Sequence, residues 1–265
     1  MRFVGSPFYF SFNEIASGIG MIAPKAAASI GNIVFFMDDG AFYRASGNVE
    51  RLPCTVLDYV FSDINKGARF KFFAANNSEH NEIIWFYASS SSTEINRYVT
   101  FNYAENVWAV GTTSNNFTRT AWDDAPTLTN PLAAGKIDTT DKNYLYNHEL
   151  GNLADGTGFS AYIESADIDL DPAGEQFMYL SKIIPDIEFQ DSSNANDTVS
   201  LVLKGRRYPN ETQSTLSTSA LTAATNYKNT RGRTRQVAVR IENADGDFKW
   251  RLGDTRFEIR PDGAK

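Results

Sequence analysis

The sequence predicts an all-β protein, a partial β-propeller of about three blades followed by a small β-sandwich or jelly-roll-like module. Three observations support this prediction. Aromatic residues make up 13% of the 265 residues, and aromatic side chains favour the half-buried surface of a sheet. An aromatic strand–turn–strand unit occurs three times. Beyond residue 178 the strands alternate cleanly, as in residues 236–241.

The repeated unit opens with an aromatic strand and returns with a strand rich in Tyr or Phe. The openings are spaced roughly 50–60 residues apart, as expected of propeller blades. The first copy turns at Asp38-Asp39-Gly40, where glycine accepts a positive φ without penalty. The copies are residues 32–46, 82–103 and 143–165, with candidate additional strands at 49–52 and 107–113.

A complete propeller has about 4–8 blades. Three copies therefore indicate either part of a larger ring or a simple meander. A short helix is expected within residues 55–67, from apolar positions at near-helical spacing. Residues 113–142 are expected to be irregular.

We place the domain boundary so that residues 1–177 hold the blades and residues 178–265 hold the sandwich-like module. The strands expected in the second domain alternate or are rich in β-branched residues. The Ser/Thr/Asn-rich stretch 210–230 is expected to be a long surface loop. The expected strands are 182–189, 197–209, 235–244 and 247–261.

The composition is that of a folded protein, with 42% apolar and 22% charged residues. Residues 1–175 carry 11 Lys and Arg against 21 Asp and Glu, a net charge of −10. Residues 176–265 carry 14 against 11, a net charge of +3. General affinity for nucleic acid needs a cationic surface, so the acidic front disfavours it. A channel through which DNA slides without sticking is compatible with this charge.

Cys54 is the only cysteine, which excludes an intrachain disulfide and a Cys-based metal cluster. A protein folded in a reducing cytoplasm fits this usage. No apolar run approaches 18 residues, so no transmembrane helix is predicted. The first residues lack the basic start and the continuous apolar core of a signal peptide.

Candidate chemistry is sparse, and no catalytic, cofactor-binding or metal-ligating residue is predicted. His80 and His148 lie in polar loops without a second ligand at metal spacing. Walker A, GxGxxG, GxSxG and HExxH patterns are all missing from the sequence. We therefore predict that the protein is not an enzyme.

Several acidic residues are candidates for a cation site or a catalytic pair. Residues 167–171, DIDLD, begin like a calcium loop, but the sixth position is Pro172 and the twelfth is Met178. A weak cation site and a solvated strand face stay open as alternatives. Glu164 with Asp167, and Asp123 with Asp124, are candidates for a carboxylate pair of the kind that glycosidases use, although no spacing singles them out.

Arg231, Arg233 and Arg235 form the densest cationic cluster. On a strand their alternation puts three guanidiniums on one face, and arginine pairs well with carboxylates and phosphates. We predict contact with an acidic protein partner at these residues. The alternatives are contact with DNA and an exposed strand with ion pairs.

Long phrases of the chain resemble the C-terminal part of tail nozzle, or packaged-DNA stabilisation, proteins of short-tailed bacteriophages. The resemblance covers most of the chain and is weakest over residues 1–19 and 190–230. The phrases that carry it are GMIAPKAAASIGNIVFFMDDGAFYR (20–44), RLPCTVLDYVFSDIN (51–65), EIIWFYASSSSTEINRYVTFNYAENVWAVGT (82–112), TAWDDAP (120–126), NPLAAG (130–135), AYIESADIDLDPAGEQFMYLSKIIPDIEF (161–189) and DFKWRLGDTRFEIRPDG (247–263).

The resemblance implies a structural protein of the virion tail, synthesised in the cytoplasm of the bacterial host. Such proteins form a ring, typically of six copies, below the portal and adaptor. They continue the DNA channel, retain the packaged genome and carry a needle or fibres. DNA would pass without sequence-specific binding, and no membrane binding is expected of the isolated chain. The family implies no cofactor.

Family members are usually longer, so the remaining blades are expected on another chain or on an upstream segment. The alternative function is a carbohydrate-binding or glycan-hydrolysing tail module. In that alternative Trp85, Trp108 or Trp122 would stack on sugars, whereas in a propeller they would fill the core between blades.

Overall fold

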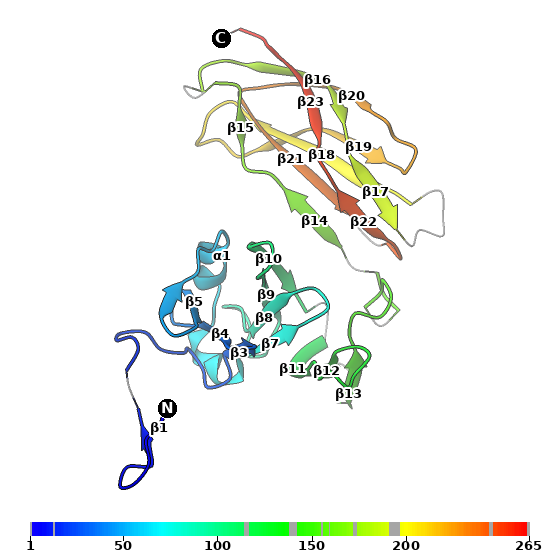
Figure 1. The fold of residues 1–265 in the computed structure, drawn as a ribbon. Coiled ribbons are helices and arrows are strands. Elements are labelled where there is room, and N and C mark those ends of the chain that lie inside the picture. Colours follow the sequence, from blue (N-terminus) through cyan, green and yellow to red (C-terminus); the bar gives the residue numbers. More distant parts are fainter. Residues whose placement is uncertain are drawn as a thin grey trace. The chain divides into compact units, whose positions relative to one another are not determined.

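The structure is a computed structural model of an all-β protein (Figure 1). The chain divides into two compact units, Met1–Leu150 and Gly151–Lys265. Within the described ranges, neither α1 (Leu57–Ser62) nor the 3₁₀ helix η1 (Lys66–Lys71) is long and apolar enough to cross a membrane. The structure describes residues 2–12, 14–113, 117–137, 142–154, 156–158, 160–171, 174–190, 197–243 and 246–263.

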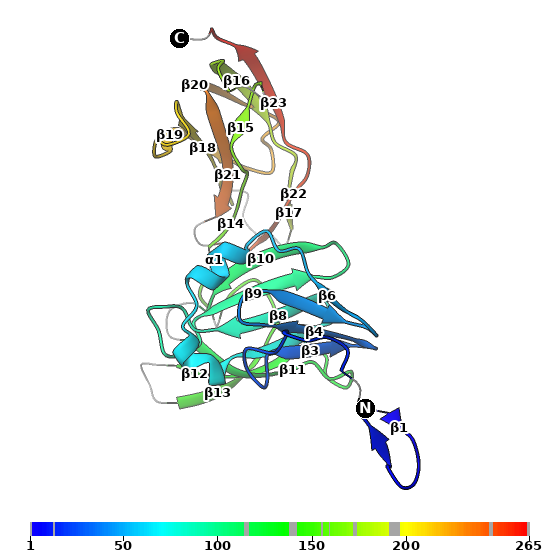
Figure 2. The ribbon, with the colours of Figure 1, turned by 90° about the vertical axis from the view of Figure 1, so that its left-hand side faces the viewer.

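The first unit contains three antiparallel meanders, which are the three blades (Figures 1 and 2). Neighbouring strands follow one another in sequence in every blade, as in propellers. Blade 1 is β3 (Ala27–Ile30), β4 (Ile33–Met37), β5 (Phe42–Ala45) and β6 (Val49–Arg51). Blade 2 is β7 (Phe73–Asn77), β8 (Glu82–Tyr87), β9 (Arg97–Asn102) and β10 (Val107–Thr112). Blade 3 is β11 (Phe117–Asp123), β12 (Leu132–Ile137) and β13 (Lys142–Asn147).

The first strands of the three blades lie side by side. β3 contacts β7, and β7 contacts β11. The Ala74 N–H donates a 2.7 Å hydrogen bond to the carbonyl of Lys25, which ties the first strand of blade 2 to the entry of blade 1. This arrangement of inner strands around one line is that of a propeller, and the predicted partial propeller is confirmed.

Aromatic residues fill the space between blade 1 and blade 2. The Phe42 ring lies 4.8 Å from each of the indoles of Trp85 and Trp108. Phe42 and Trp85 are 0% and 1% exposed. Aromatic pairs at such distances add to the free energy of burial. A smaller cluster of Phe73, Ala75, Ile84, Phe86 and Ile95 lies on the other face of blade 2, with Trp122 of blade 3 packed against it.

The second unit is a sandwich of antiparallel sheets. In the first sheet, β14 (Ala161–Glu164) and β15 (Ile168–Asp169) both pair with β21 (Gln236–Asn243), followed by β18 (Val199–Arg206) and β19 (Ser214–Leu221). The second sheet orders β20 (Lys228–Thr234), β16 (Met178–Ile184) and β23 (Arg256–Pro261). β17 (Ile187–Gln190) pairs with β22 (Lys249–Leu252). Alternate residues of both sheets meet in one core, which includes Leu180, Leu201 and Val237.

The boundary between the units lies earlier than the expected 177/178. Residues 161–164 were predicted to return to the third blade, but as β14 they pair with β21. β13, which is the predicted opening strand of the third copy, pairs instead with β12, so the other two strands of blade 3 come from residues that were expected to be irregular. The expected return strand therefore belongs to the second unit. The sequence did not reveal this, because the partner strand lies about 80 residues further along the chain and leaves no local pattern.

The expected loop at residues 210–230 is also wrong, because most of it forms β19 and the start of β20. Thr and Ser fit a pleated surface when one face packs and the hydroxyls find partners. Leu216 packs against the core, and the hydroxyls of Ser217 and Thr230 lie 3.0 Å apart.

The expected strand at 182–189 is interrupted at Pro185, which has no N–H to donate.

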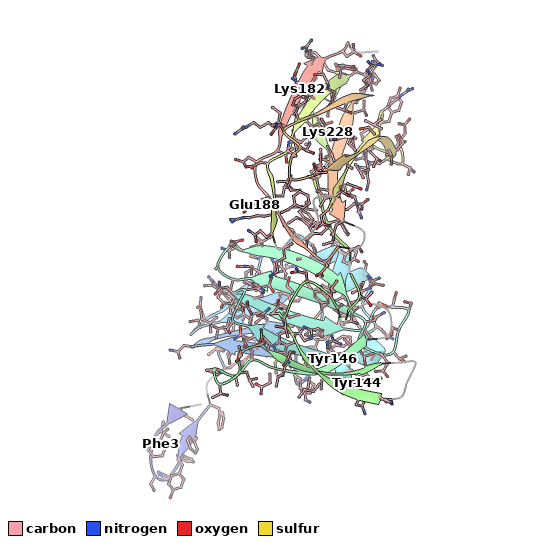
Figure 3. All side chains as sticks on the ribbon, turned by 90° about the vertical axis from the view of Figure 1, so that its right-hand side faces the viewer. Phe3, Tyr144, Tyr146, Lys182, Glu188 and Lys228 are labelled. Carbon is pink, nitrogen blue, oxygen red and sulfur yellow. The ribbon has the colours of Figure 1, made fainter. Side chains whose placement is uncertain are left out.

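The chain begins with a small hairpin of β1 (Arg2–Phe3) and β2 (Phe10–Ser11). We call residues 2–12 the arm. Most of its side chains are large, apolar and solvent-exposed. The label at Phe3 in Figure 3 marks the position of the arm. An isolated two-stranded hairpin is marginally stable in water. The exposed apolar residues of the arm are Phe3, Val4, Phe8, Tyr9, Phe10 and Phe12.

Candidate functional site

The predicted arginine cluster lies along and just beyond β20. Arg231 and Arg233 are exposed at alternate positions of the strand, whereas Arg235 lies between β20 and β21. The Arg233 guanidinium lies 4.1 Å from the centre of the Phe177 ring, and that of Arg235 lies 4.8 Å from it. Cations near an aromatic ring are attracted by its quadrupole. Arg233 and Arg235 therefore have stabilising contacts within the unit.

Further contacts hold these two arginines. Arg233 forms an ion pair with Asp262, which follows β23. Arg235 also lies 5.2 Å from the centre of the Tyr208 ring. Of the three arginines, Arg231 fits the predicted contact with a partner best. Whether a partner binds there stays a prediction.

The candidate carboxylates Glu164 and Asp167 are engaged in separate ion pairs. Glu164 accepts from Lys204 at 2.7 Å and from Arg240 at 3.1 Å. Burial tends to raise the pKa of Glu164, but hydrogen bonds from these two cations outweigh it and hold the pKa below its usual value. A general acid at neutral pH needs a raised pKa. Glu164 is therefore unsuited to that role.

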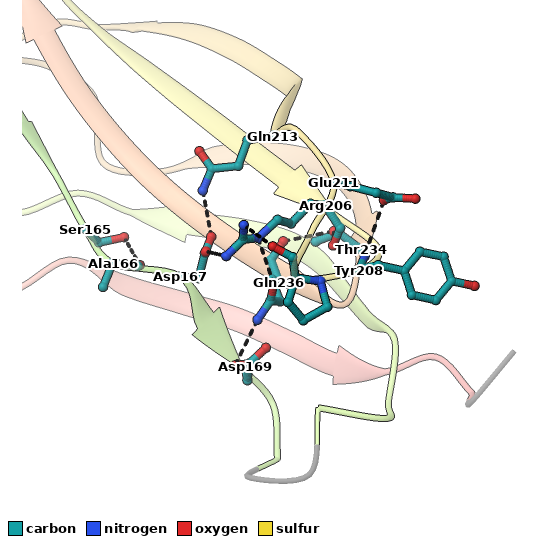
Figure 4. A network of polar contacts seen from close by, with 11 residues as sticks. Ser165, Ala166, Asp167, Asp169, Arg206, Tyr208, Glu211, Gln213, Thr234 and Gln236 are labelled. Carbon is teal, nitrogen blue, oxygen red and sulfur yellow. Dashed lines mark hydrogen bonds and ion pairs between the residues drawn. The ribbon is translucent and has the colours of Figure 1, made fainter.

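Arg206 organises the polar contacts around Asp167 (Figure 4). Its Nε donates to the side chain of Gln236 at 2.8 Å, and one Nη donates to the carbonyl of Pro209 at 2.6 Å. The other Nη pairs with Asp167, which also accepts from Gln213 at 2.7 Å. These bonds join β18, β21, the turn after β18 and the residue that precedes β15, so the group is a structural cross-brace.

The three aspartates of DIDLD do not converge on one point. Asp167 is bound by Arg206, Asp169 accepts from Gln236 at 3.3 Å, and Asp171 accepts from the N–H of Gly174 at 2.7 Å. Among the described residues, no three His, Cys, Asp or Glu are grouped so that they could hold a metal ion. Pro172 of the failed calcium pattern lies outside the described residues.

Aspartates 123 and 124 of the other candidate pair lie at the end of β11. Asp124 accepts a 2.6 Å hydrogen bond from the backbone N–H of Ser78, in the β7–β8 turn. This bond links blade 3 to blade 2. Asp123 is exposed on the last position of the strand. The two carboxylates therefore do not form a pair, because Asp124 binds the backbone of blade 2 and Asp123 is exposed to solvent.

Both histidines lie in loops, as the sequence suggested, but each has a side-chain partner and His148 is partly buried. The Arg119 Nε donates a 2.9 Å hydrogen bond to the His148 Nε2, and the His148 ring lies 4.6 Å from that of Trp122. Burial, with the nearby charge of Arg119, lowers the pKa of His148 to about 4. His80 pairs with Glu149 at 3.0 Å. Glu149 follows blade 3 and His80 belongs to blade 2, a long-range contact that the sequence pattern does not reveal.

Stability should fall as the pH falls from about 6.5 to about 4, since unfolded His148 takes up a proton at a higher pH than folded His148. For this partly exposed ring we expect a loss of about 1–2 kcal/mol between pH 7.5 and pH 5, after allowance for solvent screening. Urea unfolding at both pH values will test this. His148→Gln should lose less than the wild-type chain over the same range, and equal losses would contradict the prediction.

The three candidate tryptophans join neighbouring blades through their indole N–H groups. Trp85 donates to the carbonyl of Ala26 at 3.2 Å, Trp108 to that of Pro53 at 2.8 Å, and Trp122 to that of Asn76 at 2.9 Å. Trp85 and Trp108 are buried. Their interpretation as core between blades is confirmed for these two, and they offer no face to a sugar.

Within the part of the chain that the structure describes, two faces of the blades have no blade packed against them. In each blade the leading face points to the preceding blade and the trailing face to the following one. The leading face of blade 1 carries Val34, Phe36, Tyr43 and Ala45, which the register places on one side of the sheet. Its opposite side carries the buried Phe35 and Met37. The trailing face of blade 3 is mixed, because Ala121, Ala134 and Leu145 share it with Asp123, Asn143 and Asn147, and Leu145 is 67% exposed.

Fold and contacts together define a structural class, three propeller blades in one unit and a β-sandwich in the other. No family model and no curated protein matches the chain. Solved structures similar to it include two of an exo-beta-1,3-galactanase from Phanerochaete chrysosporium with beta-1,3-galactotriose, at 8% and 7% identity with TM-scores of 0.26 and 0.27. Each match covers 85% of this chain and 65% of the other. Similarity at this level carries no argument about the function of this protein.

Proposed function

We propose that this chain is a non-enzymatic structural protein of a bacteriophage tail, part of a nozzle ring below the portal and adaptor. The observation that carries the proposal is the leading face of blade 1, against which no blade packs within the described residues, although Phe36 on it is only 9% exposed. Phe36 and Tyr43 stack there with ring centres 5.4 Å apart, and Val34 beside them is 39% exposed. Such a face is built to pack against another sheet. The protein is therefore suited to work within an assembly.

The candidate chemical groups support a structural role. The guanidinium of Arg206, the carboxylate of Glu164 and the indoles of the propeller all bind other parts of the chain. Their contacts hold strands and blades together. The phrases that resemble tail nozzle proteins then make a phage tail the best candidate for the assembly.

The location of the protein in purified virions tests the proposal. Antibody labelling in electron micrographs should place the chain on the tail, with about six copies around the axis. Particles made by a phage whose gene for this chain is deleted should lose their genome during purification. Wild-type virions that do not contain the chain, or that carry it on the capsid shell, would contradict the proposal.

A second candidate is carbohydrate binding, which one specific observation favours. A shallow pocket of about 300 Å³ opens beside β14, β18 and β21, lined by Ser160, Ala161, Tyr162, Ser200, Arg240, Glu242 and Asn243. Tyr162 is 56% exposed, and the Arg240 guanidinium lies 3.7 Å from its ring centre. Exposed aromatic rings beside hydrogen-bonding groups suit a sugar. A glycan-binding screen with Tyr162→Ala as the control separates this candidate from the first.

Arg231→Glu should weaken incorporation of the chain into tails about tenfold, because it reverses one charge at the predicted contact with an acidic partner. The measurement is the amount of chain bound by tail particles that were assembled without it. Arg251→Glu is the matched control, since Arg251 is exposed on β22 of the same unit. Equal incorporation of both variants and the wild-type chain would contradict the predicted contact.

A further inference from the structure

We propose that the outer edge of β13 binds an extended strand of another polypeptide, which becomes the fourth strand of blade 3. Two features support this inference. The first is a row of backbone groups along β13, and the second is an uncovered apolar row on blade 2. Neither depends on the tail assignment or on the number of blades in a ring.

The register of β13 shows which of its backbone groups point outward. The His148 N–H donates to the carbonyl of Pro131, and these two residues lie opposite each other at the end of the β12–β13 pair. In an antiparallel pair, residues that exchange hydrogen bonds alternate with residues that do not. The backbone groups that point away from β12, and that pair with no described residue, therefore belong to Asn143, Leu145 and Asn147.

Blade 2 shows how an edge of this kind is used. The Thr113 N–H donates to the carbonyl of Asn96, which fixes the alternation between β9 and β10. The residues of β9 that exchange hydrogen bonds with β10 are therefore Tyr98, Thr100 and Asn102. They lie on the trailing face of their blade, as the three outward-pointing residues of β13 do. The outer edge of β13 is equivalent to the edge of β9 that carries β10.

The face of blade 2 that points to blade 3 has an uncovered apolar row on its outer strand. Val107 and Ala109 of β10 are exposed, Val107 at 54%, and Gly111 follows at the next alternate position. At the junction of blades 1 and 2, the outer strand of the following blade fills the corresponding space, because the Trp108 ring lies 4.8 Å from that of Phe42. A fourth strand in blade 3 covers Val107 and Ala109 in the same way.

The end of β13 lies at the level of this row. Glu149, two residues after β13, accepts a 3.1 Å hydrogen bond from the Asn77 side chain of blade 2. Asn77 is the first member of a row that crosses the trailing face of blade 2 from β7 to β10. The row consists of Asn77, Glu82, Asn102 and Val107. A strand added outside β13 therefore lies level with Val107.

The segment that follows β13 is used elsewhere, so the added strand belongs to another polypeptide. In blade 2 every strand pairs with the next one along the chain, but the strand after β13 is β14, which pairs with β21 of the second unit. The edge of β13 has little protection against a new strand, since its only charged residue is Lys142 and it contains no proline. Strand addition to such an edge is a common mode of binding.

The two faces of blade 3 define the chemistry of the added strand. On the leading face it lies beside Tyr144, which is 39% exposed and is labelled in Figure 3, and over the apolar row of β10. On the trailing face its neighbours include Asn143 and Asn147. Successive residues of a strand point to opposite faces. The partner strand therefore alternates large apolar side chains with polar ones.

A peptide with the sequence of β10, VWAVGT, is the probe, because β10 is the fourth strand of blade 2. Amide exchange is followed by NMR on the full chain. The amides of Asn143, Leu145 and Asn147 should exchange rapidly in the chain alone. With the peptide at about 1 mM, a concentration that detects weak binding, their exchange should slow by about twofold or more. The same peptide N-methylated at its first, third and fifth residues should not slow it, because those N–H groups face β13.

Leu145→Pro is the matched change in the chain. The Leu145 N–H does not bond to β12, so proline removes an outward-pointing donor and leaves the hydrogen bonds within blade 3 in place. It should weaken peptide binding by about tenfold, since it removes one backbone bond and adds a ring at the edge. Leu145→Ala keeps the N–H and should bind like the wild-type chain. Circular dichroism confirms that both variants are folded.

Three results would overturn the proposal. Edge amides of β13 that exchange slowly in the chain alone would show that the chain covers its own edge. Slow exchange that appears only at high protein concentration would assign the edge to a second copy. A peptide that leaves the β13 amides unprotected, or that binds equally well when N-methylated, would exclude strand addition at this edge.

Discussion

Trp85→Ala is expected to destabilise the first unit by about 3–5 kcal/mol, the usual cost of removing a buried large aromatic side chain. Trp85 is 1% exposed, and its ring contacts those of Phe42 and Trp108. The indole N–H also donates to Ala26 at the entry of blade 1. Removal therefore opens a cavity between two blades and breaks the bond that joins them. Chemical denaturation followed by circular dichroism will measure the loss.

Two variants make the Trp85 result specific. Trp85→Phe keeps most of the packing and loses the hydrogen bond, so it should cost about 1–2 kcal/mol. Trp250→Ala lies in the second unit and should leave the transition of the first unit unchanged. A Trp85→Ala protein that unfolds within about 1 kcal/mol of the wild-type chain would show that the indole does not hold the blades together.

Arg206→Ala is expected to destabilise the second unit by about 2–4 kcal/mol, the next largest effect. The substitution leaves the partly buried Asp167 without its cation and the Pro209 carbonyl without its donor. Leaving one member of such a pair unpaired is more costly than the pair itself is favourable. Arg207→Ala is the neighbouring control, because Arg207 is exposed and its loss should change stability by less than about 0.5 kcal/mol. Thermal unfolding of both variants provides the comparison.

Equal effects of Arg206→Ala and Arg207→Ala would contradict the role of Arg206 as a cross-brace. Arg206→Lys adds a further check, since lysine keeps the charge but lacks the planar fork of donors. It should recover a minor part of the loss. Gln236 and the turn carbonyl need donors in fixed directions, which an ammonium group supplies poorly.

Blades 1 and 2 could be predicted from sequence because their strands are adjacent and strongly patterned. The hairpin at β4–β5 and the one at β8–β9 are local, and their aromatic residues alternate or cluster as expected. Blade 3 was harder. β12 reads LAAGKI, and small residues give little periodic signal. Its predicted return strand pairs instead with β21, a distant segment that a local pattern cannot identify.

The arginine cluster shows a similar limit. Alternation correctly placed Arg231 and Arg233 on one exposed face of β20. It could not show that the strand ends at Thr234, or that the guanidiniums of Arg233 and Arg235 both lie against the ring of Phe177. The ring of Phe177 comes from a different part of the sequence. Contacts of this kind depend on the sheet order rather than on spacing.

The indoles of Trp85 and Trp108 lie 6.0 Å apart and nearly parallel, at 19°. At such a separation their electronic transitions couple, and a coupled pair gives circular dichroism bands of opposite sign when its two transition dipoles are skewed to one another. One indole lies on β8 and the other on β10 of blade 2, and both contact Phe42 of blade 1. The first junction between blades therefore contains its own optical reporter, which needs no label.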